Sequence, residues 1–342
     1  MRNSLAVAIA FCSAVAACQA QVTAKGANQN SGASMSPPVL GIVPDRSGES
    51  VRAITGVVGA ALFGNSVALP SAITQFYLAP RQQYALVEAR GSTTLGVLPF
   101  VAGLPGPIQS LPASMAVPDL VTFSPLGKSA AIYSRESDEL QVFSGLPGAP
   151  TMVSDIKPSN LPEKPTVMAL SDDASTVLAG SPNNDIYLLS GSSAPRLVET
   201  VGNLAAIAFV PGTTNAAVYD LSNSSLTLLL SANGTLTPRV IAQNLPITSG
   251  APSIASTLSS GGWVIENAAG KQVLVVDQNG ASHAVALPIA PDILQRLANP
   301  NLFLVSAQAN APGLVLDMSS EDARFFYIPR SSMAPVTAEA GQ

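Results

Sequence analysis

The 342-residue chain is poor in the residue types from which catalytic and metal sites are usually built. It has a single histidine, His283, and two cysteines, Cys12 and Cys18, both near the N-terminus. Because zinc sites need several His or Cys ligands, no zinc site is expected. A folded domain that begins after Cys18 has no thiol for Cys–His catalysis, and a Ser-His-Asp triad could form only around His283.

Charge is also scarce. Asp, Glu, Lys and Arg make up 11% of the chain, and acidic residues outnumber basic ones by 21 to 16, for a net charge of −5. An average soluble domain has about 25% charged residues. Lys and Arg form no cluster, whereas a nucleic-acid surface requires basic patches. We therefore expect no nucleic-acid partner.

Long hydrophobic runs are absent after residue 18, and none approaches the ~20 apolar residues of a membrane-spanning helix. The first 20 residues, MRNSLAVAIAFCSAVAACQA, contain one basic residue, an apolar stretch and then small residues. This order is typical of a signal peptide, so we expect the protein to be exported.

Two cleavage sites fit this N-terminus. Residues 15–18 (Val-Ala-Ala-Cys) resemble the bacterial lipobox, in which cleavage precedes a cysteine that carries lipid, whereas ordinary cleavage would follow Ala20. The lipobox explains Cys18, which otherwise has no disulfide partner once Cys12 is removed. Residues 19–38 are polar and rich in Gly, Ser, Asn and Ala, as in a flexible linker. We predict a lipoprotein signal peptide over residues 1–18 with lipidation at Cys18, and cleavage after Ala20 as the alternative.

The chain is rich in one repeat, in which an apolar run, a short turn and a second apolar run follow each other six times. The turn positions, from Pro80 to Asn299, lie 39 to 48 residues apart. Strand–turn–strand units at this period are typical of β-propeller blades. The six copies are Phe76–Val87, Thr122–Tyr133, Met168–Ala179, Ala208–Tyr219, Thr257–Ile265 and Gln295–Val305.

Two further apolar runs follow the copies, for example Glu139–Ser144 and Thr151–Ile156. Asn-Gly, the strongest short hairpin signal, separates such runs at residues 233–234 and 279–280. This pattern predicts six four-stranded blades between about residues 73 and 330. Val39–Val43 and Ser50–Ile54 form one more hairpin, which either begins a seventh blade or adds outer strands beside the last one.

We therefore predict an all-β fold, a β-propeller of four-stranded antiparallel blades over residues 39–330. Seven blades is the preferred count and six the alternative. The only helix expected is a short one at Pro291–Leu297, and residues 331–342 are expected to be a disordered tail.

The turn Phe123–Lys128 (FSPLGK) approximates an F-S-P-D-G-K motif, and Leu170–Asp173 (LSDD) echoes it. On these residues the chain resembles bacterial exported propellers of the WD40-like and YVTN-repeat kind, although it has no Trp-Asp dipeptide. The resemblance implies the fold of residues 39–330. It implies no partner or substrate, since propellers have many unrelated functions.

Carboxylates are the remaining candidates for ligand binding. Asp172 and Asp173 lie in a turn between two inner strands, where side chains surround one mouth of a propeller channel, and Asp220 and Asp277 each end an apolar run. Such a set could hold Ca²⁺ or act in acid–base catalysis. Asp also caps turns through its own side chain, which is its commoner role. These four are predicted channel-mouth or ligand residues, and we assign no catalytic residue, metal or cofactor.

Other side chains are assigned to packing. We expect Trp263 in the core, His283 on the outermost strand of a blade, and one ring of Phe325–Tyr327 facing outward.

Two functions fit the sequence. The preferred one is a monomeric, non-catalytic binding or scaffold module of the bacterial cell envelope. It would be exported, either anchored in the outer membrane through lipid alone or free in the periplasm or outside the cell, with an unknown protein or glycan partner. The alternative is a propeller enzyme of the lactonase or glycan-active type that uses channel-mouth carboxylates. The scarcity of catalytic side chains favours the first.

Overall fold

The computed structural model describes residues 37–329, except for residues 46, 116, 158–160, 192, 233, 248, 251, 258–260, 308–311 and 321. The predicted signal peptide, the lipidation at Cys18 and the predicted disordered tail lie outside the described residues, as does nearly all of the predicted linker. The described residues belong to one compact unit that begins at Pro37. None of their helices is long and apolar enough to cross a membrane.

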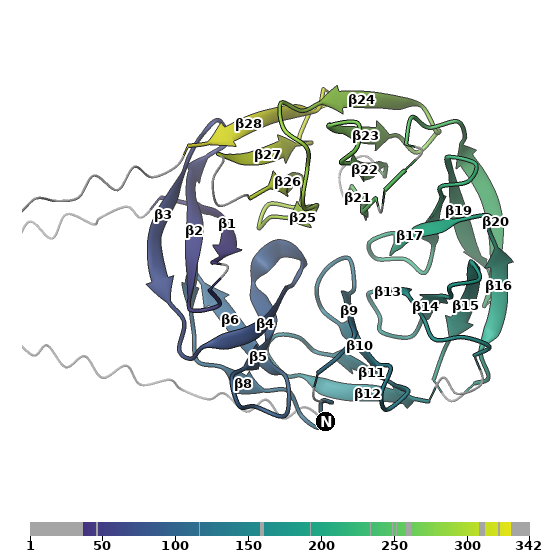
Figure 1. Cartoon of the computed structure of the whole chain (residues 1–342), viewed down its shortest axis with the longest axis horizontal. Helices are drawn as coiled ribbons and strands as arrows, with labels where there is room; N and C mark the ends of the chain where they lie inside the picture. The colour runs from purple at the N-terminus through teal and green to yellow at the C-terminus, as the bar shows by residue number, and fades with distance from the viewer. Residues whose placement is uncertain are drawn as a thin grey trace, which may run out of the picture. The chain divides into compact units, whose positions relative to one another are not determined.

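Seven antiparallel sheets stand around a central channel, each made from one continuous piece of chain (Figure 1). We number these blades 1 to 7 in chain order. The fold is therefore a seven-bladed β-propeller, as predicted, and the N-terminal hairpin forms a blade of its own. The predicted alternative of six blades is wrong.

Blades 1 and 2 differ from the rest in strand number. Blade 1 contains β1 (Val39–Pro44), β2 (Ser50–Val57) and β3 (Ala60–Ala68). Blade 2 contains β4 (Ile73–Leu78), β5 (Tyr84–Ala89), β6 (Gly96–Val101), β7 (Leu104–Pro105) and β8 (Gln109–Ser110). Because β7 and β8 both pair with β6, they share the outer position of that blade.

Blades 3 to 7 have four strands each. Blade 3 contains β9 (Leu120–Phe123), β10 (Ala130–Ser134), β11 (Glu139–Ser144) and β12 (Thr151–Ile156). Blade 4 contains β13 (Val167–Leu170), β14 (Val177–Gly180), β15 (Asp185–Leu189) and β16 (Arg196–Thr200). Blade 5 contains β17 (Leu204–Phe209), β18 (Ala216–Asp220), β19 (Ser225–Ala232) and β20 (Thr235–Ala242). Blade 6 contains β21 (Ile254–Ser256), β22 (Trp263–Asn267), β23 (Gln272–Val276) and β24 (Ser282–Ala286). Blade 7 contains β25 (Gln295–Arg296), β26 (Leu302–Ser306), β27 (Gly313–Asp317) and β28 (Arg324–Ile328).

The predicted helix at Pro291–Leu297 is wrong. Its end is strand β25, which pairs with β26, and the amide of Asp292 donates to the carbonyl of Val305 at 3.1 Å. This pairing with a neighbouring strand overrides the local helical spacing, as tertiary context often does. Within the described part of the chain the only helical segment is the 3₁₀ turn η1 (Pro80–Gln82).

The core lies between the blades. The second strand of each of blades 3 to 7 is buried along its whole length. One cluster, for example, joins Tyr133 and Leu140 of blade 3 to Met168 and Leu170 of blade 4. Strands buried on both faces have near-continuous apolar sequences, which explains the high apolar and low charged content. Trp263 of β22 is one of these buried residues and is 2% exposed, as expected.

Two faces of the ring are used below. The inner-turn face holds the turns that join the two inner strands of blades 2 to 7, such as the turn containing Pro80 and that containing Asp172. The connecting face is opposite, where the outer strand of one blade continues into the inner strand of the next. Consecutive strands in these blades are antiparallel, so all six inner strands run from the connecting face to the inner-turn face.

Candidate functional site: the central channel and its inner-turn mouth

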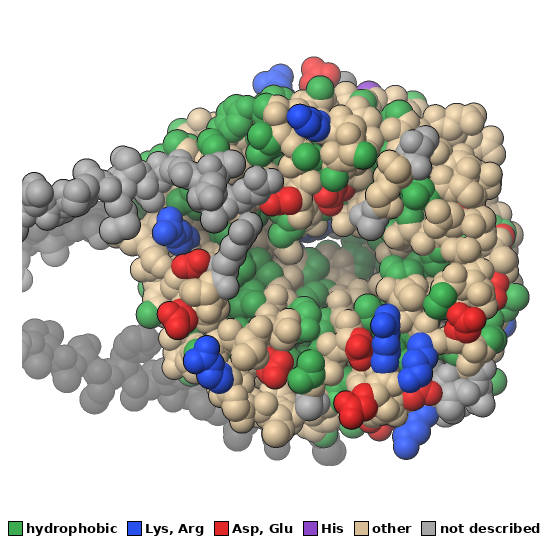
Figure 2. Space-filling view, viewed as in Figure 1, with side chains coloured by type: hydrophobic (Ala, Val, Ile, Leu, Met, Phe, Trp, Pro, Cys, Tyr) green, Lys and Arg blue, Asp and Glu red, His purple; other side chains and the backbone are tan. Residues whose placement is uncertain are grey.

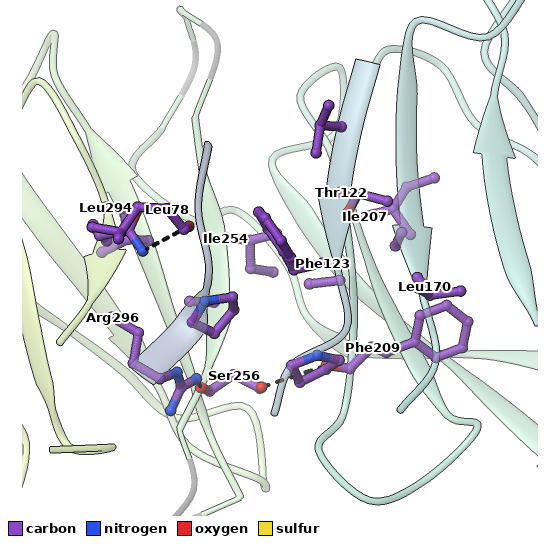
Figure 3. Close-up of a pocket in the computed structure, with 17 residues that line it drawn as sticks. Leu78, Thr122, Phe123, Leu170, Ile207, Phe209, Ile254, Ser256, Leu294 and Arg296 are labelled. Carbon is purple, nitrogen blue, oxygen red and sulfur yellow. Dashed lines mark hydrogen bonds between the residues drawn. The ribbon is translucent and has the colours of Figure 1, made fainter. Parts of the chain in front are cut away.

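The channel contains a cavity of about 270 Å³ lined by the inner strands of blades 2 to 7. Most of its lining side chains are apolar, with Leu78, Phe123, Leu170, Ile207 and Phe209 among those that face it (Figure 3). The space-filling view shows the same feature, a central hollow with a largely hydrophobic wall and charged side chains around it (Figure 2). Arg296 of β25 is the only charged side chain among the described residues that line the cavity.

Arg296 is 7% exposed, which is unusual for a cation. Its Nη1 donates to the carbonyl of Pro300 at 2.8 Å, and its Nη2 donates to the carbonyl of Ser256 (Figure 3). The guanidinium carbon lies 4.9 Å from the centre of the Phe303 ring, within cation–π range. These contacts fix the guanidinium, and neutral carbonyls and an aromatic ring are its partners here.

Burial and, to a smaller extent, the nearby cation Arg81 lower the pKa of Arg296 against the opposing effect of Asp172, and the net result is a pKa of about 10. The side chain therefore stays protonated at neutral pH. A fixed positive charge in an apolar channel is a strong site for a carboxylate, sulfate or phosphate group, because the interaction is stronger away from bulk water.

Turn η1, the inner turn of blade 2, contains two further buried hydrogen-bond donors. Arg81 Nε and Gln82 Nε2 are buried and lack a hydrogen-bond partner among the described residues. Both residues have left-handed backbone conformations, with φ of 66° and 54°, which non-glycine residues rarely adopt without a local reason. The turn contacts β25, and Arg81 is close enough to Arg296 to lower the pKa of that side chain. Neither Arg81 nor Gln82 lines the channel cavity, and the Gln82 side chain faces β1, where its Oε1 accepts from the amide of Ile42.

Asp172, predicted at this mouth, is there and holds turns of three blades together. Its Oδ1 accepts from the amide of Leu126 in blade 3, and its Oδ2 accepts from the amide of Gly212 in blade 5, both at 2.7 Å. Its neighbour Asp173 accepts from the hydroxyl of Ser171 at 2.6 Å and from the amide of Ser175 at 3.0 Å. Burial alone would raise the pKa of Asp173, but these hydrogen bonds outweigh it and lower the pKa.

Asp220 ends β18 on the connecting face, away from the other three predicted carboxylates. It is 4% exposed and accepts five hydrogen bonds, from the amides of Gly202, Asn203 and Ser222, the hydroxyl of Ser222 and the side-chain amide of Asn223. Burial acts to raise its pKa, and the hydrogen bonds, led by that of the Ser222 hydroxyl, hold it below the ordinary value.

Asp277 lies in the outer hairpin turn of blade 6, where it accepts from the amides of Asn279 at 2.8 Å and Ala281 at 2.9 Å. The structure thus brings together Asp172 and Asp173 alone. Among residues 37–329, where described, no three His, Cys, Asp or Glu side chains gather closely enough to hold a metal ion.

One further carboxyl group has an unusual environment. Glu266 of β22 is 8% exposed. Burial raises its pKa, a hydrogen bond from Ser253 lowers it, and the nearby Asp292 raises it, for a net increase. It lies near the connecting face and does not line the channel cavity.

The remaining aromatic and histidine predictions concern outer strands. His283 lies on the outer strand β24, as predicted, and is exposed. Two rings of the final strand face outward instead of the expected one. Phe325 is 38% and Tyr327 46% exposed, with ring centres 6.1 Å apart, while Phe326 packs toward blade 1.

Sequence reasoning missed Arg296 and Gln82. A signal for Arg296 is present, since it occupies the inner strand of the last repeat copy, where the other copies have apolar or small residues. No sequence signal exists for Gln82, because its burial depends on contacts of η1 with other blades.

No family model matches this sequence, and no curated protein matches it. Solved structures with a similar fold include a functionally unknown protein from Desulfotomaculum acetoxidans (TM-score 0.55, 15% identity, 85% of this chain and 100% of that chain). PorZ, described as an essential bacterial surface component of the type-IX secretion system of Porphyromonas gingivalis, has a TM-score of 0.55 at 10% identity, over 86% of this chain and 39% of that chain. Hydrazine synthase of Kuenenia stuttgartiensis has a TM-score of 0.52 at 13% identity, over 90% and 99%. At these identities the likeness shows the propeller fold alone.

Proposed function

We propose that this protein is an exported, lipid-tethered propeller of the bacterial cell envelope. It acts as a non-catalytic binding or scaffold module and recognises an anionic group of a protein or glycan partner at the inner-turn mouth of its channel. The observation that carries the proposal is Arg296, a buried cation fixed in an apolar channel wall with neutral partners. Buried charges are normally paired with an opposite charge, whereas the contacts of Arg296 described above are neutral. An anion of a binding partner would supply the opposite charge.

The Arg81 cation supports the same site, because it lies close enough to Arg296 to lower the pKa of that side chain. A carboxylate offers several acceptor positions, and Arg81 Nε and Gln82 Nε2 are buried donors that lack acceptors in the described structure.

The roles of the predicted carboxylates favour binding over the lactonase or glycan-active alternative. Each of Asp172, Asp173, Asp220 and Asp277 accepts hydrogen bonds from backbone amides of turns. Carboxylates engaged in this way stabilise loops and have fewer lone pairs free for a substrate or a metal.

Export and tethering rest on the sequence of residues 1–38. A propeller in a bacterial surface component, PorZ, gives a precedent at the level of the fold alone. Labelling with radioactive palmitate tests the tether. We expect label on the wild type and none on Cys18→Ala, and an unlabelled wild type would contradict the lipid anchor.

Thermal shift of the full chain tests the anion site, with glucuronate and sulfate as charged probes and glucose as the neutral one. We expect both anions to raise the melting temperature of the wild type and to leave Arg296→Met unaffected. Arg324→Met, on the exposed outer strand β28, is the matched control and should respond like the wild type. An equal response of Arg296→Met, or no response to millimolar anions, would contradict the proposed site.

A further inference from the structure

Blades 4 and 5 leave a wide groove between them on the connecting face. Its volume is about 1000 Å³, at the upper end of the range of ligand-binding pockets and well above that of the channel cavity. The groove is lined by the end of β16, the turn between β18 and β19, the start of β19 and the residues that follow β20. It therefore lies on the opposite face of the ring from the inner-turn mouth.

Strand β19 presents polar side chains to this groove. Side chains alternate between the two faces of a strand, so Ser225, Thr227 and Leu229 share one face. Leu229 packs in a cluster with Leu178 of blade 4, whereas Ser225 and Thr227 line the groove. In blade 6 the register position of Thr227 is occupied by Leu274, which packs in a cluster with residues of blade 5. Blade 5 thus has hydroxyl groups at a point where another blade has core packing.

One buried hydroxyl of the groove lacks a partner among the described residues. Ser225 is 6% exposed, and its hydroxyl forms no hydrogen bond with any of them. Buried polar groups are nearly always hydrogen-bonded, and leaving one unbonded costs free energy. The side chains of Thr227, Gln243 and Asn244, which also line the groove, form no hydrogen bond with described residues either. Hydroxyl and amide groups, which both donate and accept, are therefore available to a ligand.

The wall of the groove is held in place by its own hydrogen bonds. Asp220 accepts five, which fix the turn that follows β18. The amide of Leu245 donates to the carbonyl of Ser224 at 2.9 Å, and the hydroxyl of Ser224 donates to the carbonyl of Ile247 at 3.0 Å. These bonds tie the residues after β20 to the turn between β18 and β19. A wall formed in advance lowers the entropy cost of binding.

The charges of the groove disfavour anions. Glu199 and Asp220 are its charged residues, and no Lys or Arg is among the described residues that line it. The lone pairs of Asp220 are occupied by its five hydrogen bonds, whereas Glu199 forms no hydrogen bond or ion pair with described residues. A free carboxylate is a strong acceptor for a hydroxyl donor. Val240, 50% exposed, adds an aliphatic surface to the same groove.

We propose that this groove binds a neutral oligosaccharide. Sugar hydroxyls donate and accept, which matches the free hydroxyl, amide and carboxylate groups, and the C–H face of a sugar ring packs on an aliphatic side chain such as Val240. Acidic sugars would meet like charges. A single hexose fills only part of the groove, so detectable binding requires a chain of several sugars. The site is separate from the proposed anion site and does not depend on it.

A glycan array tests the proposal with the full, fluorescently labelled chain. The array carries neutral oligosaccharides of hexoses, N-acetylhexosamines and deoxyhexoses, with acidic and amino oligosaccharides as further arms. We expect the wild type to bind at least one neutral oligosaccharide. Binding to none of them, or to acidic or amino oligosaccharides alone, would overturn the inference.

A double variant tests whether the groove is the place of binding. Ser225→Ala with Thr227→Val removes two unbonded hydroxyls with little change in shape, so the melting temperature should stay close to that of the wild type. The matched control is Thr235→Ala with Thr237→Val, on the exposed part of β20. We expect the affinity for the bound oligosaccharide to fall at least about tenfold in the first variant and to stay unchanged in the control. Equal affinities would overturn the inference.

Two single variants complete the test. Glu199→Gln removes the strong acceptor and keeps the shape of the side chain, so it should also weaken binding about tenfold, which gives a second reading if the double variant does not fold. Arg296→Met should bind the neutral oligosaccharide like the wild type. A loss seen in Arg296→Met alone would assign the sugar to the channel mouth and overturn the groove as its site.

Discussion

Asp220 and Glu266 are both buried carboxyl groups near the connecting face, and their surroundings act in opposite directions. Asp220 accepts five hydrogen bonds, mostly from backbone amides, which favour its charged form. Glu266 is dominated by burial and by the nearby Asp292, which favour its neutral form. The same chemical group is therefore stabilising at one position and costly at the other at neutral pH.

Asp220→Asn is expected to lower the free energy of unfolding at pH 7 by about 2–3 kcal/mol, because hydrogen bonds to a charged acceptor are lost. Since folding lowers the pKa of Asp220, its contribution is present above the unfolded pKa of about 4 and is lost as the pH falls through the folded pKa. The difference from the wild type should therefore shrink at pH 3. Urea unfolding at both pH values measures it, with the exposed Asp322→Asn as control. An equal difference at the two pH values would refute this role.

Glu266→Gln is expected to act in the opposite sense. Folding raises the pKa of Glu266, so its contribution is fully present below the unfolded pKa and is lost as the pH rises through the folded pKa. Removing the charge should raise the free energy of unfolding at pH 7 by about 0.5 kcal/mol and change little at pH 3. The same urea experiment decides this, and a variant destabilised at pH 7 would show that the charged form is needed.

For single residues, the sequence predicts hydrogen bonds to near neighbours in the chain well and hydrogen bonds to other blades poorly. Turn capping by Asp277 involves residues two and four positions away, which a sequence pattern can show. The bridge made by Asp172 joins Leu126 and Gly212, 46 and 40 residues away in other blades. Such a role depends on the curvature of the whole ring, which no local pattern contains.

The hairpins are the elements that the sequence predicts best. Strands β11 and β12 have the predicted bounds, and the two Asn-Gly positions join β19 to β20 and β23 to β24. Apolar runs and turn residues define these hairpins locally. Strand β25 lies in the last predicted repeat copy, Gln295–Val305, but also in the predicted helix Pro291–Leu297, because its two residues become a strand only through pairing with β26.

The glycines of these two turns offer a matched pair. Gly234 and Gly280 both have positive φ, of 74° and 88°, but a Cβ on Gly234 meets no atom within 4 Å, whereas one on Gly280 would lie 1.7 Å from the carbonyl oxygen of Ile241 in blade 5. Gly234→Ala should cost about 1 kcal/mol for backbone strain, and Gly280→Ala about 2–4 kcal/mol because the blades must also separate. Equal losses in thermal unfolding would argue against a close contact at Gly280.

For the whole molecule, the contacts between blades 1, 2 and 7 decide how the ring closes. Blade 1 is built from the start of the described chain and blade 7 from its end, and no strand is shared between them. A mixed cluster, including Ile54 and Phe63 with Leu302 and Ile328, joins the two blades. The sequence predicts the number of blades but not the packing of blade 1 on blade 7, because these contacts join residues from opposite ends of the described chain, which no local pattern contains.

Gln82→Leu should weaken this closure. It leaves the buried amide of Ile42 without its acceptor, at a cost of about 1–3 kcal/mol. Because the lost hydrogen bond belongs to blade 1, amide hydrogen exchange should accelerate in β1–β3 more than in blades 4 and 5. Gln75→Leu, on the exposed part of β4, is the control and should leave exchange unchanged. A uniform acceleration around the ring would contradict a local closure.

The neighbouring positions of blades 1 and 7 also have a mechanical consequence. Pro37 and Pro329, the first and last described residues, belong to these adjacent blades, so tension applied between the two ends is resisted first by one interface between sheets. That interface depends on side-chain packing and a few hydrogen bonds, whereas every other pair of successive blades is also joined by continuous backbone. Under load in an optical trap, the first rupture should therefore open the ring between blades 1 and 7 before any single blade unravels.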